Sequence, residues 1–518
     1  MLAPVLLIAV ALYATFAVLR AIQQFFHQRK NARALGCQPP RRAANGFLGI
    51  PGFLRMARSV REKRWLYYLL EQYQLNGTTF TANLFGRTMV MTIEPENLKA
   101  LLATQFNDFG LGTRHREFYP LLGDGIFTLD GAGWSHARAL LRPQFTKDQV
   151  ADLALLDDHV SRLIDMLPKD RSGFDIQTLF YCLTMDSATH FLFGESVGSL
   201  LPPSSSSAPS VLEKSTGGAQ GFAEAFNLAQ DYLAARSRAQ DLYWAVNPRR
   251  YRGAIKKVHD LVDNYVRLAL ESRSKNRQEK QENTRYIFLQ ALAAETQDPK
   301  VLRDNLLNIL LAGRDTTASL LSSTFYLLAR HPNVWQKLRQ IVIGEFGDSR
   351  RPVADITHAK LKDIPYLRYV LNETLRLYPP VPLNFRVAMV NTSLPVGGGP
   401  DQRAPVYVKK DTLVGYNVFA MHRRKDLWGE DAHVFRPERW EENAKRGWEY
   451  LPFNGGPRIC LGQQYALTEA SYTLVKLMQH FDTLENADPH VGDDPVLVST
   501  LTMSHDRGVL IRLYSSED

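Results

Sequence analysis

A cysteine in a glycine-rich loop is the residue of this chain best suited to chemistry. Cys460 stands in the stretch Phe453–Gly462, whose glycines allow the backbone to approach a flat ligand closely. A thiolate in such a loop can bind iron. The alternative is an inert buried thiol, since a free cysteine packs as a small hydrophobe. The other cysteines, Cys37 and Cys182, are too few and too scattered for a disulfide framework or a zinc cluster, so any cysteine chemistry depends on one thiol.

Polar residues interrupt an apolar helical pattern earlier in the chain. The mostly apolar segment Leu306–Ala312 runs into Gly313-Arg314-Asp315-Thr316-Thr317, and the apolar pattern resumes over Ala318–Leu328. Polar groups inside an apolar helix need a reason. One reason is a threonine hydroxyl that hydrogen-bonds to the carbonyl one turn earlier, which bends a helix at modest cost. The other is a functional site on this helix.

An acid and a base share one face of another predicted helix. Glu373 and Arg376 are three residues apart, and Tyr378-Pro379-Pro380 ends the helix that carries them. An exposed pair of this kind is usually worth well under about 1 kcal/mol. The spacing alone therefore assigns the pair no role.

The cysteine loop matches a known pattern at every defined position. The stretch Phe453-Asn454-Gly455-Gly456-Pro457-Arg458-Ile459-Cys460-Leu461-Gly462 is similar to the Phe-x-x-Gly-x-Arg-x-Cys-x-Gly haem loop of the cytochrome P-450 family. The other two motifs stand in the order and spacing of that family. The chain therefore resembles a haem-thiolate monooxygenase.

This resemblance implies a haem b group whose iron takes Cys460 as its axial ligand. Haem carries two propionates that need cationic or N–H partners. The resemblance assigns this part to Trp134, Arg138, Arg386 and Arg458. It further implies that Gly313 leaves room for dioxygen, that Thr316 hydrogen-bonds to it, and that Asp315 relays protons from solvent.

The resemblance also gives the acid–base pair a structural part. In this family the pair is buried and is completed by an arginine from a later Phe-x-Pro-Glu-Arg segment, here Phe435–Arg439. Arg439 would then share the charge of Glu373 with Arg376. A carboxylate without these partners in the core costs several kcal/mol, so their loss should remove the fold and the haem.

Several longer stretches are most similar to the fungal alkane and fatty-acid hydroxylases that act at chain ends. They are Leu371–Pro382, Asn384–Arg386, Ala420–Asp426 and Cys460–Ala470. The resemblance implies an apolar substrate tunnel lined by Phe222, Phe226, Leu383, Phe385 and Leu501. Animal terminal hydroxylases carry a haem-esterifying glutamate where this chain has Ala312, so we expect a non-covalent haem.

The N-terminus predicts a membrane anchor. The run Leu2–Leu19 is uncharged and mostly apolar, and as a helix it is long enough to cross most of a bilayer. Residues 1–22 are therefore expected to form one transmembrane helix. Nine of the 62 Lys and Arg residues precede the first acid, Glu62, which leaves 53 bases against 53 acids in the remainder. By the positive-inside rule, the body is expected on the cytosolic side of the endoplasmic reticulum membrane. Because the excess of bases is confined to the membrane end, nucleic acid is not the expected partner.

The remaining chain is expected to be mostly α with a small β region, a cytochrome P-450 fold. Residues 23–52 form a basic, Pro- and Gly-rich elbow that cannot continue the first helix, and residues 53–518 form the haem-thiolate domain. Thr79–Ile93 alternates like paired strands around a break at Gly86. Two polar segments, Leu201–Gly218 and Ser272–Arg285, are expected to be solvent loops.

The predicted reaction inserts one oxygen atom of dioxygen into an aliphatic C–H bond, with electrons from NADPH through a cytochrome P-450 reductase. The candidates for the basic surface that meets the reductase are Lys147, Arg423, Arg424 and Lys425. A haem-thiolate isomerase or dehydratase of lipid hydroperoxides is one alternative, which Asp315-Thr316 argues against. A haem-based sensor or carrier, and a monooxygenase of sterols, xenobiotics or other lipophilic metabolites, are the others.

Overall fold

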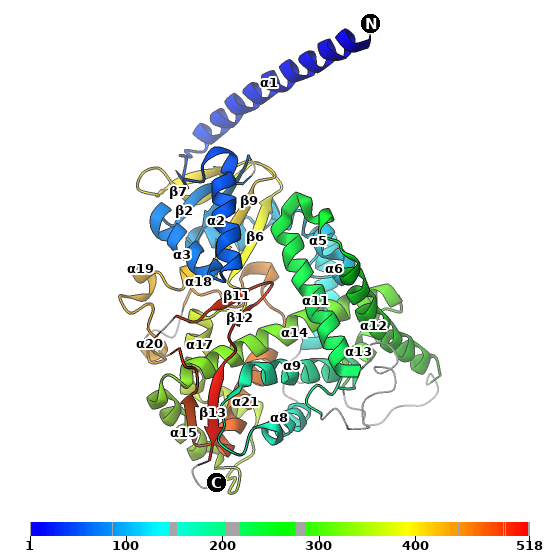
Figure 1. The fold of residues 1–518 in the computed structure, drawn as a ribbon, viewed down its shortest axis with the longest axis vertical. Helices are drawn as coiled ribbons and strands as arrows, with labels where there is room; N and C mark the ends of the chain where they lie inside the picture. The colour runs from blue at the N-terminus through cyan, green and yellow to red at the C-terminus, as the bar shows by residue number, and fades with distance from the viewer. Residues whose placement is uncertain are drawn as a thin grey trace.

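The computed structural model describes residues 2–84, 86–145, 153–201, 218–275, 286–442, 446–490, 492 and 494–515, and shows a body made mostly of helices (Figure 1). The predicted fold class, mostly α with a small β region, is confirmed. The helices are α1 (Leu2–Ala34), α2 (Ile50–Arg61), α3 (Trp65–Asn76), α4 (Pro95–Lys99), α5 (Arg114–Leu122), α6 (Gly131–Leu141), α8 (Ala154–Met166), α9 (Ile176–Phe193), α11 (Gly218–Ala239), α12 (Arg249–Lys275), α13 (Phe288–Glu295), α14 (Pro299–Leu328), α15 (Pro332–Phe346), α16 (His358–Lys362), α17 (Pro365–Leu377), α18 (Val418–Met421), α19 (Lys425–Trp428), α20 (Arg439–Glu442) and α21 (Gln463–His480).

In the described ranges, the strands gather into one larger sheet and three small ones. They are β1 (Arg41–Arg42), β2 (Thr79–Leu84), β3 (Arg87–Thr92), β4 (Phe109–Gly110), β5 (Phe174–Asp175), β6 (Leu383–Ala388), β7 (Thr392–Gly398), β8 (Ala404–Val408), β9 (Leu413–Asn417), β10 (Thr483–Asn486), β11 (Leu497–Ser499), β12 (Met503–His505) and β13 (Leu510–Tyr514). The larger sheet has the order β1-β2-β3-β9-β6-β4. Its β2–β3 hairpin turns at Gly86, which takes a positive φ of 78°, so the predicted break is confirmed.

Helix α1 extends away from the body (Figure 1). Of the predicted anchor over residues 1–22, Met1 lies outside the described residues, and so do the side chains of residues 2–10, 14, 17 and 21. Among the residues that the structure does describe, no helix is both long and apolar enough to cross a membrane. The anchor therefore stays a prediction.

Helix α1 continues to Ala34, so residues 23–34 of the predicted elbow are helical, which corrects the expectation that the whole elbow interrupts the first helix. The helix ends before the Cys37-Gln38-Pro39-Pro40 stretch, and the rest of the elbow is not irregular throughout. β1 joins the larger sheet by pairing parallel with β2. Helix α2 already begins at Ile50, with Pro51 in its first turn. Proline is tolerated there because the first backbone N–H groups of a helix have no partner within it. The expectation that the Gly49–Gly52 stretch resists helix is corrected at this point.

The expectation of a loop over Ser272–Arg285 is also corrected in part. Helix α12 continues to Lys275, so the first residues of that polar segment are helical. Residues 276–285 lie outside the described residues, as do residues 202–217 of the serine-rich segment.

The long helix α14 forms the centre of the body and packs against α9, α12, α17 and α21. Its N-terminus is capped by the Asp298 carboxylate, which accepts hydrogen bonds from the backbone N–H groups of Lys300 and Val301. The apolar segments before and after Gly313–Thr317 form one unbroken helix, and the polar residues between them are part of it. Those polar residues are thereby held at the middle of the molecule.

Helix α17 buries the predicted ion pair. The Glu373 carboxylate accepts hydrogen bonds from Arg376 Nε and Nη2 at 2.9 and 2.8 Å and from Arg439 Nε at 2.8 Å. The side chains of Glu373 and Arg376 are 0% exposed. Two further donors, which the motifs do not reveal, are the indole Nε1 of Trp440 at 3.0 Å and the backbone N–H of Arg436 at 3.1 Å. The buried carboxylate is therefore fully satisfied.

Removing this carboxylate should destabilise the whole fold. Glu373→Ala leaves the buried guanidinium of Arg376 without its counterion and that of Arg439 with Asp431 alone, and we expect the free energy of unfolding to fall by about 3–5 kcal/mol, together with loss of bound cofactor. Denaturant unfolding monitored by circular dichroism measures the loss. The control is Glu438→Gln, which removes the partly exposed pair with Lys337 and should cost under about 1 kcal/mol. Equal losses in the two variants would show that burial gives the Glu373 network no special weight.

Candidate active site

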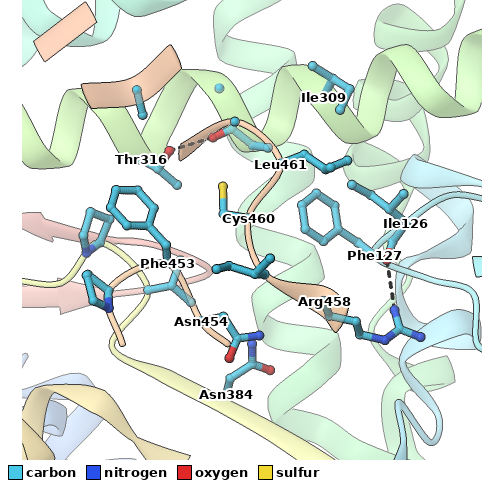
Figure 2. Close-up of a pocket in the computed structure, with 18 of the residues that line it drawn as sticks. Ile126, Phe127, Ile309, Thr316, Asn384, Phe453, Asn454, Arg458, Cys460 and Leu461 are labelled. Atoms are coloured by element: carbon cyan, nitrogen blue, oxygen red, sulfur yellow. Dashed lines mark hydrogen bonds between the residues drawn. The ribbon is translucent and has the colours of Figure 1, made fainter. Parts of the chain in front are cut away.

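The loop Phe453–Gly462 and the middle of α14 face each other across a cavity. Figure 2 shows the thiol of Cys460 pointing toward the face of α14 that carries Thr316 and Ile309. The loop is held by the Cys460 N–H, which donates to the Phe453 carbonyl at 3.1 Å. At Gly456, where φ is 67°, a Cβ atom would lie 1.8 Å from the carbonyl oxygen of Leu102, so this position accepts only glycine.

The surroundings of the thiol suit a metal ligand better than an acid–base group. Cys460 is exposed to the cavity, but the surrounding protein keeps most bulk water away, and this desolvation raises the pKa of its thiol. The Gly462 N–H and the charge of Arg138 act in the opposite direction. The loop leads directly into α21, so the positive end of that helix dipole is close to the sulfur. A bound metal cation would hold the thiol as thiolate in spite of this desolvation.

The face of α14 opposite the thiol carries Gly313 and Thr316, both of which line the cavity. The Thr316 hydroxyl donates to the Ala312 carbonyl at 2.7 Å, so the backbone hydrogen bond considered as an alternative is present. The same side chain nevertheless borders the cavity. A Cβ atom at Gly313 would meet only the Cβ of Ala188, at 3.9 Å, so glycine here keeps the cavity open and does not relieve a clash.

Asp315 is buried but does not line this cavity. Its carboxylate lies 3.2 Å from Nη1 of Arg314. Burial raises the pKa of Asp315, and the charge of Arg314 lowers it by a smaller amount. Although Asp315 and Thr316 are adjacent in sequence, the helical rotation of α14 places Thr316 on the cavity side and Asp315 away from it.

All four residues predicted to hold carboxylates line the same cavity as Cys460. They are Trp134, Arg138, Arg386 and Arg458. Sequence reasoning missed a fifth, Arg114, which lines the cavity and donates to Asn384 Oδ1 at 2.8 Å. No motif marks Arg114 or distinguishes it from its neighbour Arg116.

The positive charge of these guanidinium groups exceeds the negative charge that the protein places beside them. Among the described residues, Asp130 is the one acid in an ion pair with any of them, at 2.7 Å from Arg458. Burial lowers the pKa of Arg114 to about 10, with repulsion from Arg386 as the next cause. Burial likewise lowers the pKa of Arg458 to about 10, and three neighbouring arginines add to the effect. A ligand with two carboxylates would relieve this excess of positive charge.

The five residues predicted to contact substrate do not line this cavity, which corrects that expectation. Phe222 and Phe226 are fully buried and pack in the core beside α12, with Leu501 at its edge. Leu383 packs against the main core, and Phe385 lies under the guanidinium of Arg114. The reason for the last two is strand parity: successive side chains of β6 point to opposite faces, and Asn384 and Arg386 take the cavity face.

The apolar wall of the cavity is supplied by other elements. Its members near Cys460 include Ile126, Phe127, Phe191, Leu192, Ile309 and Val381. They belong to the segments before α6 and after α17 and to helices α9 and α14. Hydrophobicity alone does not tell which of these side chains face a cavity and which face the core.

Comparison with known proteins decides the family. The model of the family described as Cytochrome P450 matches residues 52–505. The chain belongs to the cytochrome P450 family. Its relatives include Cytochrome P450 52A12 of Debaryomyces hansenii, 50% identical over 93% of each chain, and Cytochrome P450 52A4 of Candida maltosa, 52% identical over 85% of this chain and 82% of the relative. Cytochrome P450 52A1 of Candida tropicalis is 51% identical over 84% of this chain and 80% of the relative.

The predicted family is thus confirmed, and with it the activity and the cofactor. This cytochrome P450 is a haem-thiolate monooxygenase that takes its electrons from a reductase. The site fits the haem, because one thiol faces a cavity lined by four arginines, of which only Arg458 has an acid paired with it among the described residues. Residues Cys460, Arg114, Arg138, Arg386 and Arg458 are the ones that would hold it.

Arg386 offers a clean test of the arginine cluster, because within the described part of the chain its side chain donates only to the adjacent Phe385 carbonyl. We expect Arg386→Leu to lower the haem content of the purified full-length protein several-fold, since a charge-assisted hydrogen bond contributes about 1.5–3 kcal/mol. Arg386→Lys keeps the charge and should retain most of the haem. Haem per protein, measured from the absorbance of the pyridine complex, compares them. Full haem content in Arg386→Leu would remove Arg386 from the cofactor site.

Proposed function

We propose that this cytochrome P450 hydroxylates the terminal or near-terminal carbon of fatty acids or n-alkanes. The supporting observation is the apolar wall above Cys460, where Phe127, Ile309 and Val381 offer no charge to a substrate. The cations of the cavity are grouped at the cofactor end. An unbranched hydrocarbon end is the substrate chemistry that this wall would favour, in agreement with the resemblance to fungal chain-end hydroxylases.

When bound, the haem supplies the centre at which dioxygen is reduced, and a thiolate ligand favours cleavage of the O–O bond. In this proposal Cys460 is that ligand, and the arginines with Trp134 hold the propionates. Gly313 would leave room in the cavity for dioxygen, and Thr316 would present its hydroxyl to that space. Asp315 supplies protons from the far side of α14 and would need a small rotation or a water molecule to reach Thr316.

Turnover with defined components tests the activity. The full-length enzyme, a membrane-bound NADPH reductase and a series of fatty acids and alkanes should give NADPH oxidation tied to hydroxylated product, which mass spectrometry identifies. Conversion of lipid hydroperoxides without NADPH would favour the isomerase. Tight haem binding without any turnover would favour a sensor, and product from sterols alone would replace the substrate class.

Cys460 should be indispensable for the thiolate spectrum. In Cys460→Ser, an oxygen replaces the sulfur and donates far less electron density, so the reduced carbon-monoxide complex should lose its thiolate signature. Cys182→Ser, which changes a thiol outside the cavity, is the matched control and should leave the spectrum unaltered. A thiolate spectrum that persisted in Cys460→Ser would exclude Cys460 as the ligand.

Chain-length preference should respond to the cavity wall and not to the opposite face of β6. Each buried CH₂ is worth about 0.8 kcal/mol, so affinity should rise roughly tenfold for every two carbons until the cavity is filled. Ile309→Phe narrows the wall and should shift the preference to shorter chains or the hydroxyl away from the terminal carbon. Leu383→Phe enlarges a side chain outside the wall and should leave the chain-length preference and the position of hydroxylation unchanged. The reverse pattern would place the substrate on the other face of β6.

We also propose that α1 anchors the enzyme to the endoplasmic reticulum membrane, with the body on the cytosolic side. The uncharged run Leu2–Leu19 and the bases that follow it support this. Exposed apolar side chains on the body, among them Phe47 at 80% and Trp244 at 65%, would provide a second contact with the lipid surface.

Deletion of residues 1–36 should release the enzyme from the membrane. The cut removes all of α1 and four of the nine excess bases but no residue of the core, so the product should move to the soluble fraction and still bind haem. Fractionation of membranes by centrifugation, with haem absorbance as the readout, checks both. Retention of the shortened protein on membranes would show that the contact through Phe47 and Trp244 suffices.

The surface that would meet the reductase needs revision. Arg423 is held over the Phe419 ring at 3.6 Å, and Arg424 is paired with Glu94 and Asp426. Lys425 is exposed but paired with Glu430, and Lys147 lies outside the described residues. We therefore place the contact at the exposed bases of the Cys460 side, such as Arg142, which borders the hollow behind the cysteine loop.

A further inference from the structure

A neutral amide stands among the arginines of the cavity and has no part in the proposed mechanism. Asn384 lies on β6, two residues before Arg386, so the two side chains share the face of the strand that lines the cavity. Figure 2 shows its carboxamide with that of Asn454, at the end of the cavity away from α14. Tyr416 connects the two, because it is opposite Asn384 in the sheet and its hydroxyl donates to Asn454 Oδ1 at 3.1 Å.

The orientation of the Asn384 amide is fixed by its hydrogen bonds. Its Oδ1 atom accepts from Nη2 of Arg114 at 2.8 Å and from the backbone N–H of Phe385 at 2.9 Å. A guanidinium and a backbone N–H can only donate, so the atom that they reach must be the amide oxygen. The other side of the amide is then the Nδ2 group, which carries two protons and can only donate.

The Nδ2 group has no acceptor on the protein. Among the residues that the structure describes, none accepts a hydrogen bond from it. The neighbouring side chains of Arg114 and Arg386 are themselves donors. Asp130, the acid paired with this cluster, is already engaged by Arg458 and by the N–H of Leu111, each at 2.7 Å. The amide protons therefore remain unused at the edge of the cavity.

A donor that lies among cations calls for an acceptor with negative charge. A carboxylate meets this requirement, because one of its oxygens can accept from the amide and the other from a guanidinium. Haem and a fatty acid both carry carboxylates. A fatty acid hydroxylated near its chain end keeps its carboxylate a chain length from the reacting carbon, whereas Asn384 borders the same cavity as Cys460. The choice of haem over fatty acid rests on the proposed function.

We propose that Asn384 donates from Nδ2 to a haem carboxylate, beside Arg114 and Arg386. A neutral donor suits this position better than a further cation. The arginines of the cavity already repel one another, and another guanidinium would increase that repulsion, whereas an amide adds a hydrogen bond without charge. Through its oxygen the same side chain holds Arg114, so Asn384 contacts the cofactor and also positions a second group that does.

Resonance Raman spectroscopy of the haem-loaded full-length enzyme tests the contact without substrate or turnover, because the bending bands of the haem carboxylates respond to their hydrogen bonds. Asn384→Leu keeps the branched shape, removes both polar atoms and should shift one of these bands. The matched control is Asn391→Leu. Asn391 is exposed, lies away from the cavity and also accepts a backbone N–H, from Lys410 at 2.9 Å. Its bands should stay in place. Unshifted bands in Asn384→Leu would overturn the inference.

The rate of haem release, measured by transfer to an excess of apomyoglobin, gives a second test. Asn384→Leu should release haem about tenfold faster than the wild type, because a hydrogen bond to a charged acceptor is lost. Asn384→Asp is a smaller change that keeps the oxygen used by Arg114 and replaces the donor by an anionic oxygen. It should also release haem faster, whereas Asn391→Asp should match the wild type. A wild-type rate in Asn384→Asp would mean that only the oxygen matters, which would overturn the inference.

A double-mutant cycle separates direct contact from an effect through Arg114. In an Arg114→Leu background, Asn384→Leu should still speed haem release several-fold, because its own hydrogen bond is lost. No further loss in that background would show that Asn384 only holds Arg114, and would overturn the inference.

Substrate binding separates the two sources of a carboxylate. If Asn384→Leu weakened the binding of fatty acids but not of n-alkanes of equal length, with normal Raman bands and normal haem release, the carboxylate would belong to the substrate and the inference would be wrong. If neither fatty acids nor alkanes gave hydroxylated product, the proposed function would fail, while shifted bands and faster haem release would still support the contact with haem.

Discussion

The buried carboxylate of Glu373 is the interaction on which the active site depends. Through Arg376 it is linked to the carbonyls of His422 and Ala432, and through Arg439 to the carboxylate of Asp431. These contacts tie α17 to the long irregular segment that precedes the cysteine loop. That segment has little regular structure of its own, so its position is set by a charge that must be neutralised in the core. The loop with Cys460 inherits that position.

Electrostatics divides the cavity into two regions. At one end, burial and then mutual repulsion lower the pKa of Arg114 and Arg458, and an anionic cofactor would relieve that repulsion. At the side of α14 and α21, burial raises the pKa of Glu469, while the hydroxyls of Ser187 and Thr317 lower it by smaller amounts. The fold provides these opposite surroundings around one cavity because the arginines come from α5, α6, β6 and the cysteine loop, whereas Glu469 comes from α21.

Motifs predicted the site well where a residue's type is demanded by chemistry, and poorly where only shape matters. Cys460, Arg386 and Glu373 could be found because a ligand or a buried charge requires them. Leu383 could not be assigned correctly, because hydrophobicity does not reveal which face of β6 meets the cavity, and one step along a strand reverses the face. Arg114 was missed for another reason: it comes from a distant segment, and only the fold brings it beside Arg386.

Gly313 shows what the enzyme gives up for its cavity. Alanine in the middle of a helix is more stable than glycine by about 1 kcal/mol, and at Gly313 the nearest atom to a new Cβ would be 3.9 Å away. Selection for stability alone would therefore replace this glycine. A gene copy that acquired alanine at this position would encode a protein that folds, holds haem and binds the reductase, but whose cavity is partly filled. This protein would compete with the active enzyme for electrons, so selection would act against it.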